Sequence, residues 1–166
     1  MTTLPIFRQL IADDAAAFRA LRLAGLQEAP TAFGSSYAKE RDSTVEDFAG
    51  TIARNHMVGA LIGDRLVGVA GFYRSAGEKV EHRGNIWGVY VEPEARGQGI
   101  ARGLIERLLE HAKTVVEQVH LCVVTDNVAA VRLYEGLGFV SYGTEPRALK
   151  VDGTFYDELM MVWRAV

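Results

Sequence analysis

The sequence has a single cysteine and no long hydrophobic run. Cys122 has no partner for a disulfide within the chain, and it lies in the apolar segment 119–124, which predicts a buried thiol on a strand. No apolar stretch approaches the roughly 20 residues that a membrane-spanning helix needs. The N-terminus also lacks the basic start and the apolar core of a secretory signal. We therefore expect a cytoplasmic protein that does not enter a membrane.

An excess of positive charge is absent as well. Eighteen Lys and Arg residues are balanced by 21 Asp and Glu residues, which gives a net charge of −3 at pH 7. Proteins that bind nucleic acid or anionic membranes usually carry a basic excess. We therefore expect neither partner, and ligands have to be inferred from individual motifs.

Glycine, by contrast, is abundant and unevenly placed. The length of 166 residues fits one domain, 1–166, and the content of 49% hydrophobic and 23% charged residues is typical of a globular protein. Ten of the 17 glycines lie between Gly59 and Gly103. Because glycine permits backbone conformations and close approaches that other residues do not, we expect this stretch to carry function.

The hydrophobic periodicity predicts a mixed α/β domain. Apolar patterns indicate strands at 5–10, 57–62, 66–73, 81–91, 119–124, 139–144 and 155–164. Helical spacing indicates one helix that follows Asp14 and ends by Gly25 and Pro30, and three more at about 44–55, 98–114 and 127–136. Residues 31–41 are predicted to be a loop. The helix at 98–114 joins two strands that we expect to be parallel neighbours.

A turn between the strand 81–91 and the helix 98–114 has the features of an anion site. The helix start offers free N–H groups and a favourable dipole, and Gly97 and Gly99 let a ligand approach the backbone. Arg96 can add a forked, charged donor, so a pyrophosphate would fit. The sequence has neither the third glycine of a dinucleotide fingerprint nor a nucleotide P-loop. On the two glycines alone, a tight structural turn is an equally good interpretation.

Two longer motifs resemble the GNAT superfamily of N-acetyltransferases. Arg96-x-x-Gly99-x-Ala101, after the strand 87–93, is similar to the acetyl-CoA motif of that family. Downstream, Asn127 near the start of a short helix and Tyr134 further along it are similar to the second family motif. The resemblance implies acetyl-CoA as co-substrate. It also implies a central, largely antiparallel sheet of about seven strands with one splayed parallel pair, flanked by about four helices.

The resemblance further implies how the chain would hold acetyl-CoA. The strand backbone at Val89, Tyr90 and Val91 would hold the pantetheine arm and stabilise the oxyanion of the tetrahedral intermediate. Gly88, in mid-strand, is compatible with a bulge that separates this strand from 119–124. The pyrophosphate would lie on the turn that consists of Arg96, Gly97, Gln98, Gly99, Ile100 and Ala101.

The resemblance implies roles for two further residues, but it does not identify the general base. Tyr134 would be the general acid that protonates the departing thiolate, and Asn127 would cap its helix, contact the pantetheine, or do both. Family members that use a glutamate as general base carry it where this chain has Cys122 or Asn85. The other candidates are weak, because each reads more simply as an ordinary charge on or beside a strand: Glu81, His82, Glu92 and His120.

The acceptor is not identified by the sequence. We expect direct attack of a primary amine on the thioester, but a non-catalytic acyl-CoA-binding or sensing module stays open, as does a protein N-terminal or lysine acetyltransferase. Specificity is expected from 31–41, 44–55 and 145–156. Arg147 and Lys150 in the last segment favour either a carboxylate on the acceptor or a solvated hairpin. Trp87 fits either the acceptor side of the slot between the two separated strands or the core. No metal site is predicted, and the resemblance allows a homodimer.

Overall fold

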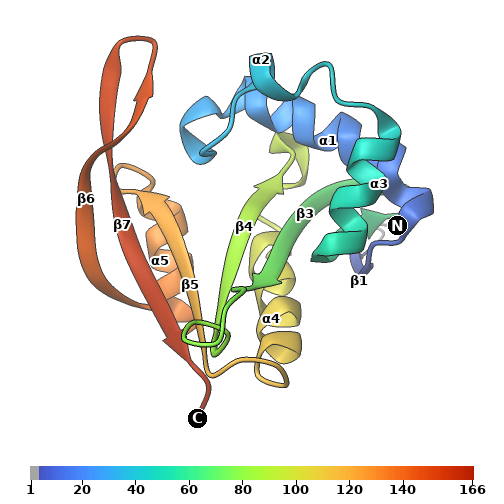
Figure 1. The fold of residues 1–166 in the computed structure, drawn as a ribbon. Coiled ribbons are helices and arrows are strands. Elements are labelled where there is room, and N and C mark those ends of the chain that lie inside the picture. Colours follow the sequence, from blue (N-terminus) through green and yellow to red (C-terminus); the bar gives the residue numbers. More distant parts are fainter. Residues whose placement is uncertain (1–3) are drawn as a thin grey trace.

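A sheet of seven strands runs through the computed structural model, which describes residues 4–166 (Figure 1). Neighbouring strands are antiparallel except β4 and β5, which are parallel, and the order is β1-β2-β3-β4-β5-β7-β6. The predicted fold class is confirmed, and residues 1–3 of the predicted domain lie outside the described residues. The strands are β1 (Ile6–Gln9), β2 (His56–Ile62), β3 (Arg65–Arg74), β4 (Arg83–Val91), β5 (Gln118–Val124), β6 (Val140–Val151) and β7 (Thr154–Arg164).

Helices cover both faces of the sheet, and each face has its own hydrophobic cluster. The first and third helices pack on one face, and the fourth and fifth pack on the other. Within residues 4–166 there are five α-helices, namely α1 (Ala15–Glu28), α2 (Tyr37–Glu40), α3 (Val45–Arg54), α4 (Ile100–Ala112) and α5 (Val128–Gly136). In this part of the chain no helix is long and apolar enough to cross a membrane.

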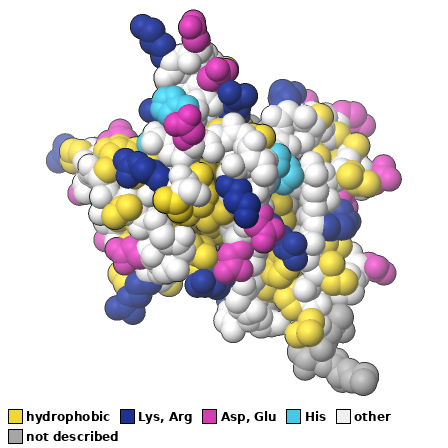
Figure 2. Space-filling model, turned by 90° about the horizontal axis from the view of Figure 1, so that it is seen from below, with side chains coloured by type: hydrophobic (Ala, Val, Ile, Leu, Met, Phe, Trp, Pro, Cys, Tyr) yellow, Lys and Arg dark blue, Asp and Glu magenta, His cyan; other side chains and the backbone are white. Residues whose placement is uncertain are grey.

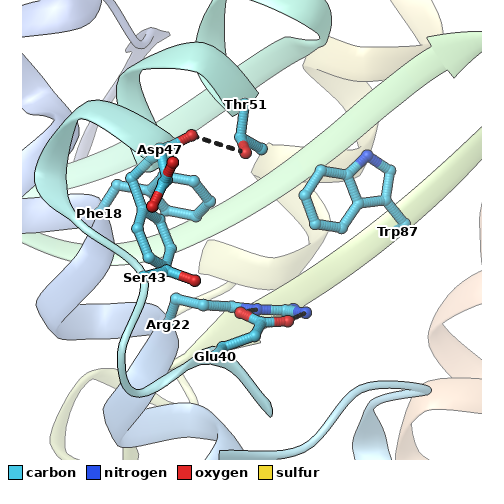
Figure 3. A pocket seen from close by; sticks show the side chains of 8 residues that line it. Phe18, Arg22, Glu40, Ser43, Asp47, Thr51 and Trp87 are labelled. Carbon is cyan, nitrogen blue, oxygen red and sulfur yellow. Dashed lines mark hydrogen bonds and ion pairs between the residues drawn. The ribbon is translucent and has the colours of Figure 1, made fainter.

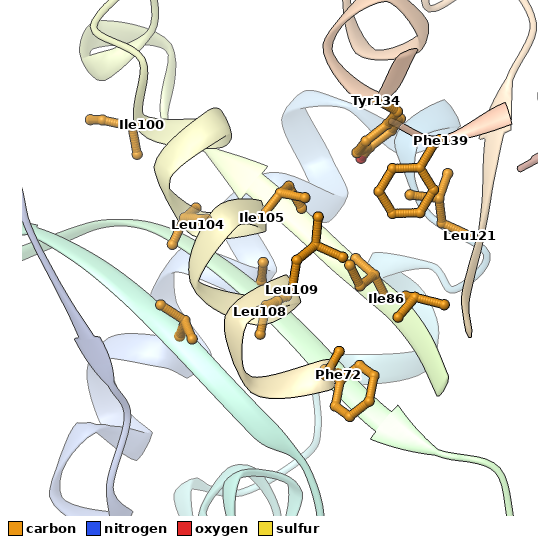
Figure 4. Close-up of a cluster of buried hydrophobic side chains, with 14 of the residues drawn as sticks. Phe72, Ile86, Ile100, Leu104, Ile105, Leu108, Leu109, Leu121, Tyr134 and Phe139 are labelled. Carbon is orange, nitrogen blue, oxygen red and sulfur yellow. The ribbon is translucent and has the colours of Figure 1, made fainter. Parts of the chain in front are cut away.

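The helix α4 anchors the larger cluster (Figure 4). Its residues Leu104, Ile105 and Leu108 are completely buried, and they face Phe72 of β3 and Ile86 of β4. Each such side chain stabilises the fold by about 1.5–3 kcal/mol relative to an exposed one. The turn that precedes α4 is thereby fixed against the end of β4.

The first helix ends just before Pro30 as the sequence predicts, but Gly25 lies within it. It continues through Gly25 to Glu28, so Gly25 does not end it. A side chain at Gly25 would crowd the rings of Tyr90 and Phe33, with a Cβ only 3.0 Å from Cγ of Tyr90. The glycine therefore serves close packing between α1 and β4.

Two further boundaries differ from the prediction. The short helix α2 lies in the predicted loop 31–41, where the Ser36 side chain accepts a hydrogen bond from the Lys39 N–H at 3.2 Å. The strand β6 extends to Val151, beyond its predicted end near residue 144, and forms a long hairpin with β7 (Figure 1). Most side chains of β6 are exposed, which is why the hydrophobic pattern did not indicate its second half.

The molecular surface carries charges of both signs. On the face shown in Figure 2, basic and acidic side chains are interspersed over the surface. This mixture agrees with the near balance of charges in the sequence.

The strands β4 and β5 separate along their length. They pair only from Arg83 to Asn85 on β4, opposite Gln118 to His120 on β5. Beyond this point β4 is irregular against β3, and Gly88 has a φ of +63°. A bulge increases the local twist of a strand, so the predicted separation at Gly88 is confirmed.

Candidate active site

The separation of β4 and β5 opens a pocket of about 460 Å³. Residues 86–91 of β4 form one wall and residues 121–124 of β5 form the other. Tyr134 of α5 and Asn127, which precedes α5, line it from the helical side, and Arg96 and Ala101 line it at the turn 96–101, which we call the glycine turn. Because β4 is unpaired with β5 here, N–H and C=O groups on this edge are available to a ligand.

The glycine turn has a left-handed backbone conformation at both of its glycines. Gly97 and Gly99 have φ values of +78° and +75°, and a Cβ at either position would meet no atom within 4 Å. Glycine is therefore required by the backbone conformation and not by crowding. Gly99 precedes α4 without a side-chain cap, so the first N–H groups of this 13-residue helix have no side-chain acceptor from that residue.

Arg96 already has a carboxylate partner. Its guanidinium donates to the two carboxylate oxygens of Glu28 at 2.7 and 3.2 Å, and its Nε donates to the Val91 carbonyl at 2.9 Å. The Tyr90 hydroxyl donates to the same glutamate at 3.1 Å. The hydrogen bond from Arg96 lowers the pKa of Glu28. Arg96, which the sequence predicts to contact the pyrophosphate, is thus held at the pocket edge by the negative charge of Glu28.

Tyr134 of α5 lines the pocket between β4 and β5. Its side chain is buried against Phe139, with ring centroids 5.8 Å apart. Burial raises the pKa of Tyr134 to about 12. The phenol is therefore protonated at neutral pH.

Asn127 caps α5 as predicted. Its Oδ1 accepts a hydrogen bond from the Ala130 N–H at 3.2 Å. Asn127 also lines the pocket, so the cap does not remove it from reach of a ligand.

A second pocket, of about 570 Å³, lies on the other side of the separated strands. Arg22 of α1 and the loop after it form part of its wall, opposite Asn85, His120 and Tyr142 of the sheet. The two pockets meet at a junction, which we define as the residues that line both: Ala32, Ile86, Trp87, Gly88, Leu121, Cys122 and Glu158.

The wall near α1 is held by a partly buried ion pair (Figure 3). The Arg22 guanidinium donates to both carboxylate oxygens of Glu40, at 2.8 and 3.0 Å, and lies between the rings of Phe33 and Trp87. Trp87 donates its indole N–H to Asn55 at 3.1 Å and lines both pockets. Both predicted places are therefore observed, because the partly buried ring also packs against the hydrophobic cluster around α1.

Three of the four weak candidates for the base lie away from the junction. Glu81 and His82 precede β4 and line a separate depression beside Lys113, and Glu92 pairs with Arg65. His120 does line the second pocket, where its ring hydrogen-bonds Gln118 at 2.9 Å and Tyr142 at 3.1 Å. Burial lowers the pKa of His120, and nearby cationic groups lower it further.

The prediction of a buried Cys122 is wrong. The thiol is exposed, because the face of β5 that carries it lines the second pocket, where β4 and β5 separate. Burial of part of its surface raises the pKa of the Cys122 thiol, and the charges of Glu158 and Glu145 raise it further.

Glu158 is a site residue that the sequence did not reveal. It lies on β7, lines both pockets, and has a pKa raised by burial and then by Glu145. The pattern predicted a strand at 155–164, but it held no signal that this strand lies beside β5.

Arg147 and Lys150 lie outside the junction. Both cations lie over the ring of Phe155, at 4.5 and 5.2 Å from its centroid. Arg147 also adopts a φ of +54° and donates its N–H to Asp157 at 2.8 Å. The solvated hairpin is thus the observed arrangement, and neither residue lines the two pockets.

Known proteins resemble this chain in sequence. The model of the Acetyltransferase (GNAT) family matches residues 23–139. N-alpha-acetyltransferase RimI of Mycobacterium tuberculosis is 40% identical over 99 residues, which are 60% of this chain and 61% of that protein. Spermidine N(1)-acetyltransferase of Vibrio cholerae is 35% identical over 78 residues, which are 46% of this chain and 45% of that protein. The matches thus cover less than two thirds of either relative.

Solved structures resemble it in fold. An acetyltransferase of the GNAT family from Streptococcus pneumoniae superposes with a TM-score of 0.86 at 22% identity, over 96% of this chain and 99% of that one. The yncA protein of Salmonella typhimurium, a putative acetyltransferase solved with acetyl-CoA, gives a TM-score of 0.85 at 20% identity, over 98% and 94% of the two chains. Because the family model matches more than half of this chain, the chain belongs to the GNAT family of acetyltransferases.

Proposed function

We propose that this protein is an acetyl-CoA-dependent N-acetyltransferase that acetylates a primary amine. The supporting observation is the junction, where a pocket beside an unpaired strand edge meets a second, open pocket. A thioester in the first pocket and an amine in the second would meet there, which converts a bimolecular step into a nearly intramolecular one.

The residues present fit acetyl-CoA. The glycine turn and the start of α4 would bind the pyrophosphate through backbone N–H groups. The free edge of β4 at Val89, Tyr90 and Val91 would bind the amide groups of the pantetheine arm. The amide of Asn127 would offer a further polar contact.

The chemistry is a direct acyl transfer. The neutral amine forms a C–N bond with the thioester carbonyl, and a backbone N–H of β4 stabilises the oxyanion. Collapse of the tetrahedral intermediate breaks the C–S bond, and Tyr134 gives its proton to the leaving sulfur. The dry surroundings that raise the pKa of Tyr134 also disfavour a free thiolate, so the two effects partly offset each other.

Release of free CoA tests this function. The protein and acetyl-CoA are incubated with small amines, polyamines and peptides, and the new thiol is followed with a thiol reagent. We expect release that depends on one class of amine. Binding of acetyl-CoA without turnover on any of these amines would instead support the non-catalytic acyl-CoA module.

A protein N-terminus is the second candidate acceptor. The similarity to a protein named N-alpha-acetyltransferase RimI favours it, and peptides with free and with blocked N-termini distinguish it from small amines. Cytoplasmic location and a homodimer stay predictions from the sequence.

A further inference from the structure

We infer that Glu158 is the general base of this reaction and takes the proton from the acceptor amine. The inference rests on the proposed function and adds the group that the sequence did not identify. Among the junction residues, Glu158 has the only carboxylate, and the only other titratable side chain there is the Cys122 thiol. A base at this place reaches an amine that has left the second pocket and approaches the thioester.

The strand register brings Glu158 to the junction. In the antiparallel pair of β5 and β7, Glu158 lies opposite Val124, and Met160 lies opposite Cys122. Residues two apart on a strand point to the same face, so the carboxylate and the Cys122 thiol are diagonal neighbours on one face. The influence of Glu158 on the pKa of Cys122 agrees with this proximity.

The carboxylate of Glu158 is free to accept a proton. Within residues 4–166 no ion pair involves Glu158. By contrast, Glu40 is held on both oxygens by Arg22. Both ring nitrogens of His120 are engaged, and this histidine lines only the second of the two pockets.

The surroundings of Glu158 favour a base of useful strength. Burial raises its pKa, and Glu145, which lies directly opposite on β6, raises it further. A base is most effective when its pKa approaches the working pH. The other titratable or charged groups that share a pocket with Glu158 come from the remaining elements: Arg22 of α1, Tyr73 of β3, Arg83 and Tyr90 of β4, Arg96 of the turn, His120 and Cys122 of β5, Tyr134 of α5, and Tyr142 of β6.

Protons balance in the resulting step. The ammonium form of the acceptor gives one proton to Glu158, which passes it to solvent, and the neutral amine then attacks the thioester. The nitrogen loses a second proton to solvent as the amide forms, while the sulfur gains one from Tyr134, which regains a proton from solvent. The overall products are the acetylated amine, CoA with its thiol protonated, and one proton in solution.

The variant Glu158→Gln tests the inference, with Glu145→Gln as control. With the amine that the wild type acetylates, we expect kcat of Glu158→Gln to fall by about 10²-fold or more at neutral pH, with an unchanged Kd for acetyl-CoA. The acid limb of the wild-type kcat/KM profile should disappear. Glu145→Gln should lower kcat far less than Glu158→Gln does and should move that limb to lower pH, because it removes the charge that raises the pKa of Glu158.

The outcomes separate this inference from the proposed function. A Glu158→Gln variant that keeps wild-type kcat and the wild-type pH profile would overturn the role of Glu158 and leave the acetyltransferase function standing. A wild type that turns over no amine would overturn the function and, with it, the base. Circular dichroism and acetyl-CoA binding show whether each variant is folded, and the pH profile distinguishes a base from a residue that only supports the sheet.

Discussion

Tyr134 and Glu158 line one pocket from opposite faces of the sheet. Tyr134 belongs to α5 and packs in the cluster around α4, whereas Glu158 projects from β7 on the face that carries Cys122. The space between the separated strands β4 and β5 connects them. An acid and a base on the two sides of a thioester are what acetyl transfer to an amine requires.

Replacement of Tyr134 by Phe tests the acid. The substitution keeps the ring that packs on Phe139 and removes only the hydroxyl. We expect kcat to fall by about 10²-fold, with little change in the Kd for acetyl-CoA. Steady-state kinetics and a binding titration measure the two quantities, and an unchanged kcat would exclude Tyr134 as the proton donor.

Loss of the Glu158 charge should not weaken the fold. Its raised pKa means that the folded state binds the proton more tightly than the unfolded chain does, so the ionised group destabilises the protein at neutral pH. Stability from this group is regained as the pH falls through the folded-state pKa toward the ordinary glutamate value. Thermal unfolding of Glu158→Gln should therefore give a higher Tm than the wild type at neutral pH, by a margin that shrinks in acid. A lower Tm at neutral pH would contradict this.

A carboxylate moved to the neighbouring strand should restore activity. Because Cys122 and Glu158 are diagonal neighbours at the junction, Cys122→Glu in the Glu158→Gln background places a base on the same face. We expect the double variant to be about tenfold faster than Glu158→Gln, a modest part of the range for general base catalysis. Double variants no faster than Glu158→Gln would show that the base acts from elsewhere. Cys122→Gln in the same background is the matched control.

Glu28 should weaken the binding of acetyl-CoA. Its carboxylate holds Arg96 and places a negative charge beside the proposed pyrophosphate site. We expect Glu28→Gln to lower the Kd at low salt by about twofold to fivefold, which corresponds to about 0.5–1 kcal/mol for an exposed pair, and Arg96→Ala to raise it. High salt should reduce both effects. If Glu28→Gln binds more weakly, the glutamate instead positions Arg96 for the ligand.

Gly88 should be costly to replace. Its φ of +63° is unfavourable for other residues, and a Cβ would lie 3.4 Å from Nη1 of Arg22. We expect Gly88→Ala to lower stability by about 1–2 kcal/mol, or the Tm by roughly 2–8 °C. Gly34→Ala is the control, because a Cβ there meets nothing within 4 Å. Equal Tm values for the two variants would show that the bulge imposes no strain.

Local patterns predicted the parts of the site that lie on one stretch of chain. The strand, the turn with Gly97 and Gly99, and the helix after it follow one another directly, so spacing alone predicted their arrangement. The predicted helix 44–55 likewise begins with a local motif, a capping box in which Thr44 and Asp47 exchange hydrogen bonds of 3.2 and 2.8 Å.

Features that depend on distant neighbours could not be predicted in this way. Gly103 had no explanation in the sequence, but in the fold a side chain there would collide with the ring of Phe7. Cys122 is exposed only because β4 leaves β5. Glu158 reaches the junction only because β7 inserts between β5 and β6, an order that no pattern along the chain encodes.

The most direct test of the central claim is the joint measurement of both products for the wild-type protein with a panel of primary amines. If the junction catalyses acetyl transfer, free CoA and acetylated amine appear in equal amounts with at least one acceptor, and Tyr134→Phe and Glu158→Gln each slow both. Tight binding of acetyl-CoA with no acetylated amine from any acceptor would contradict the account.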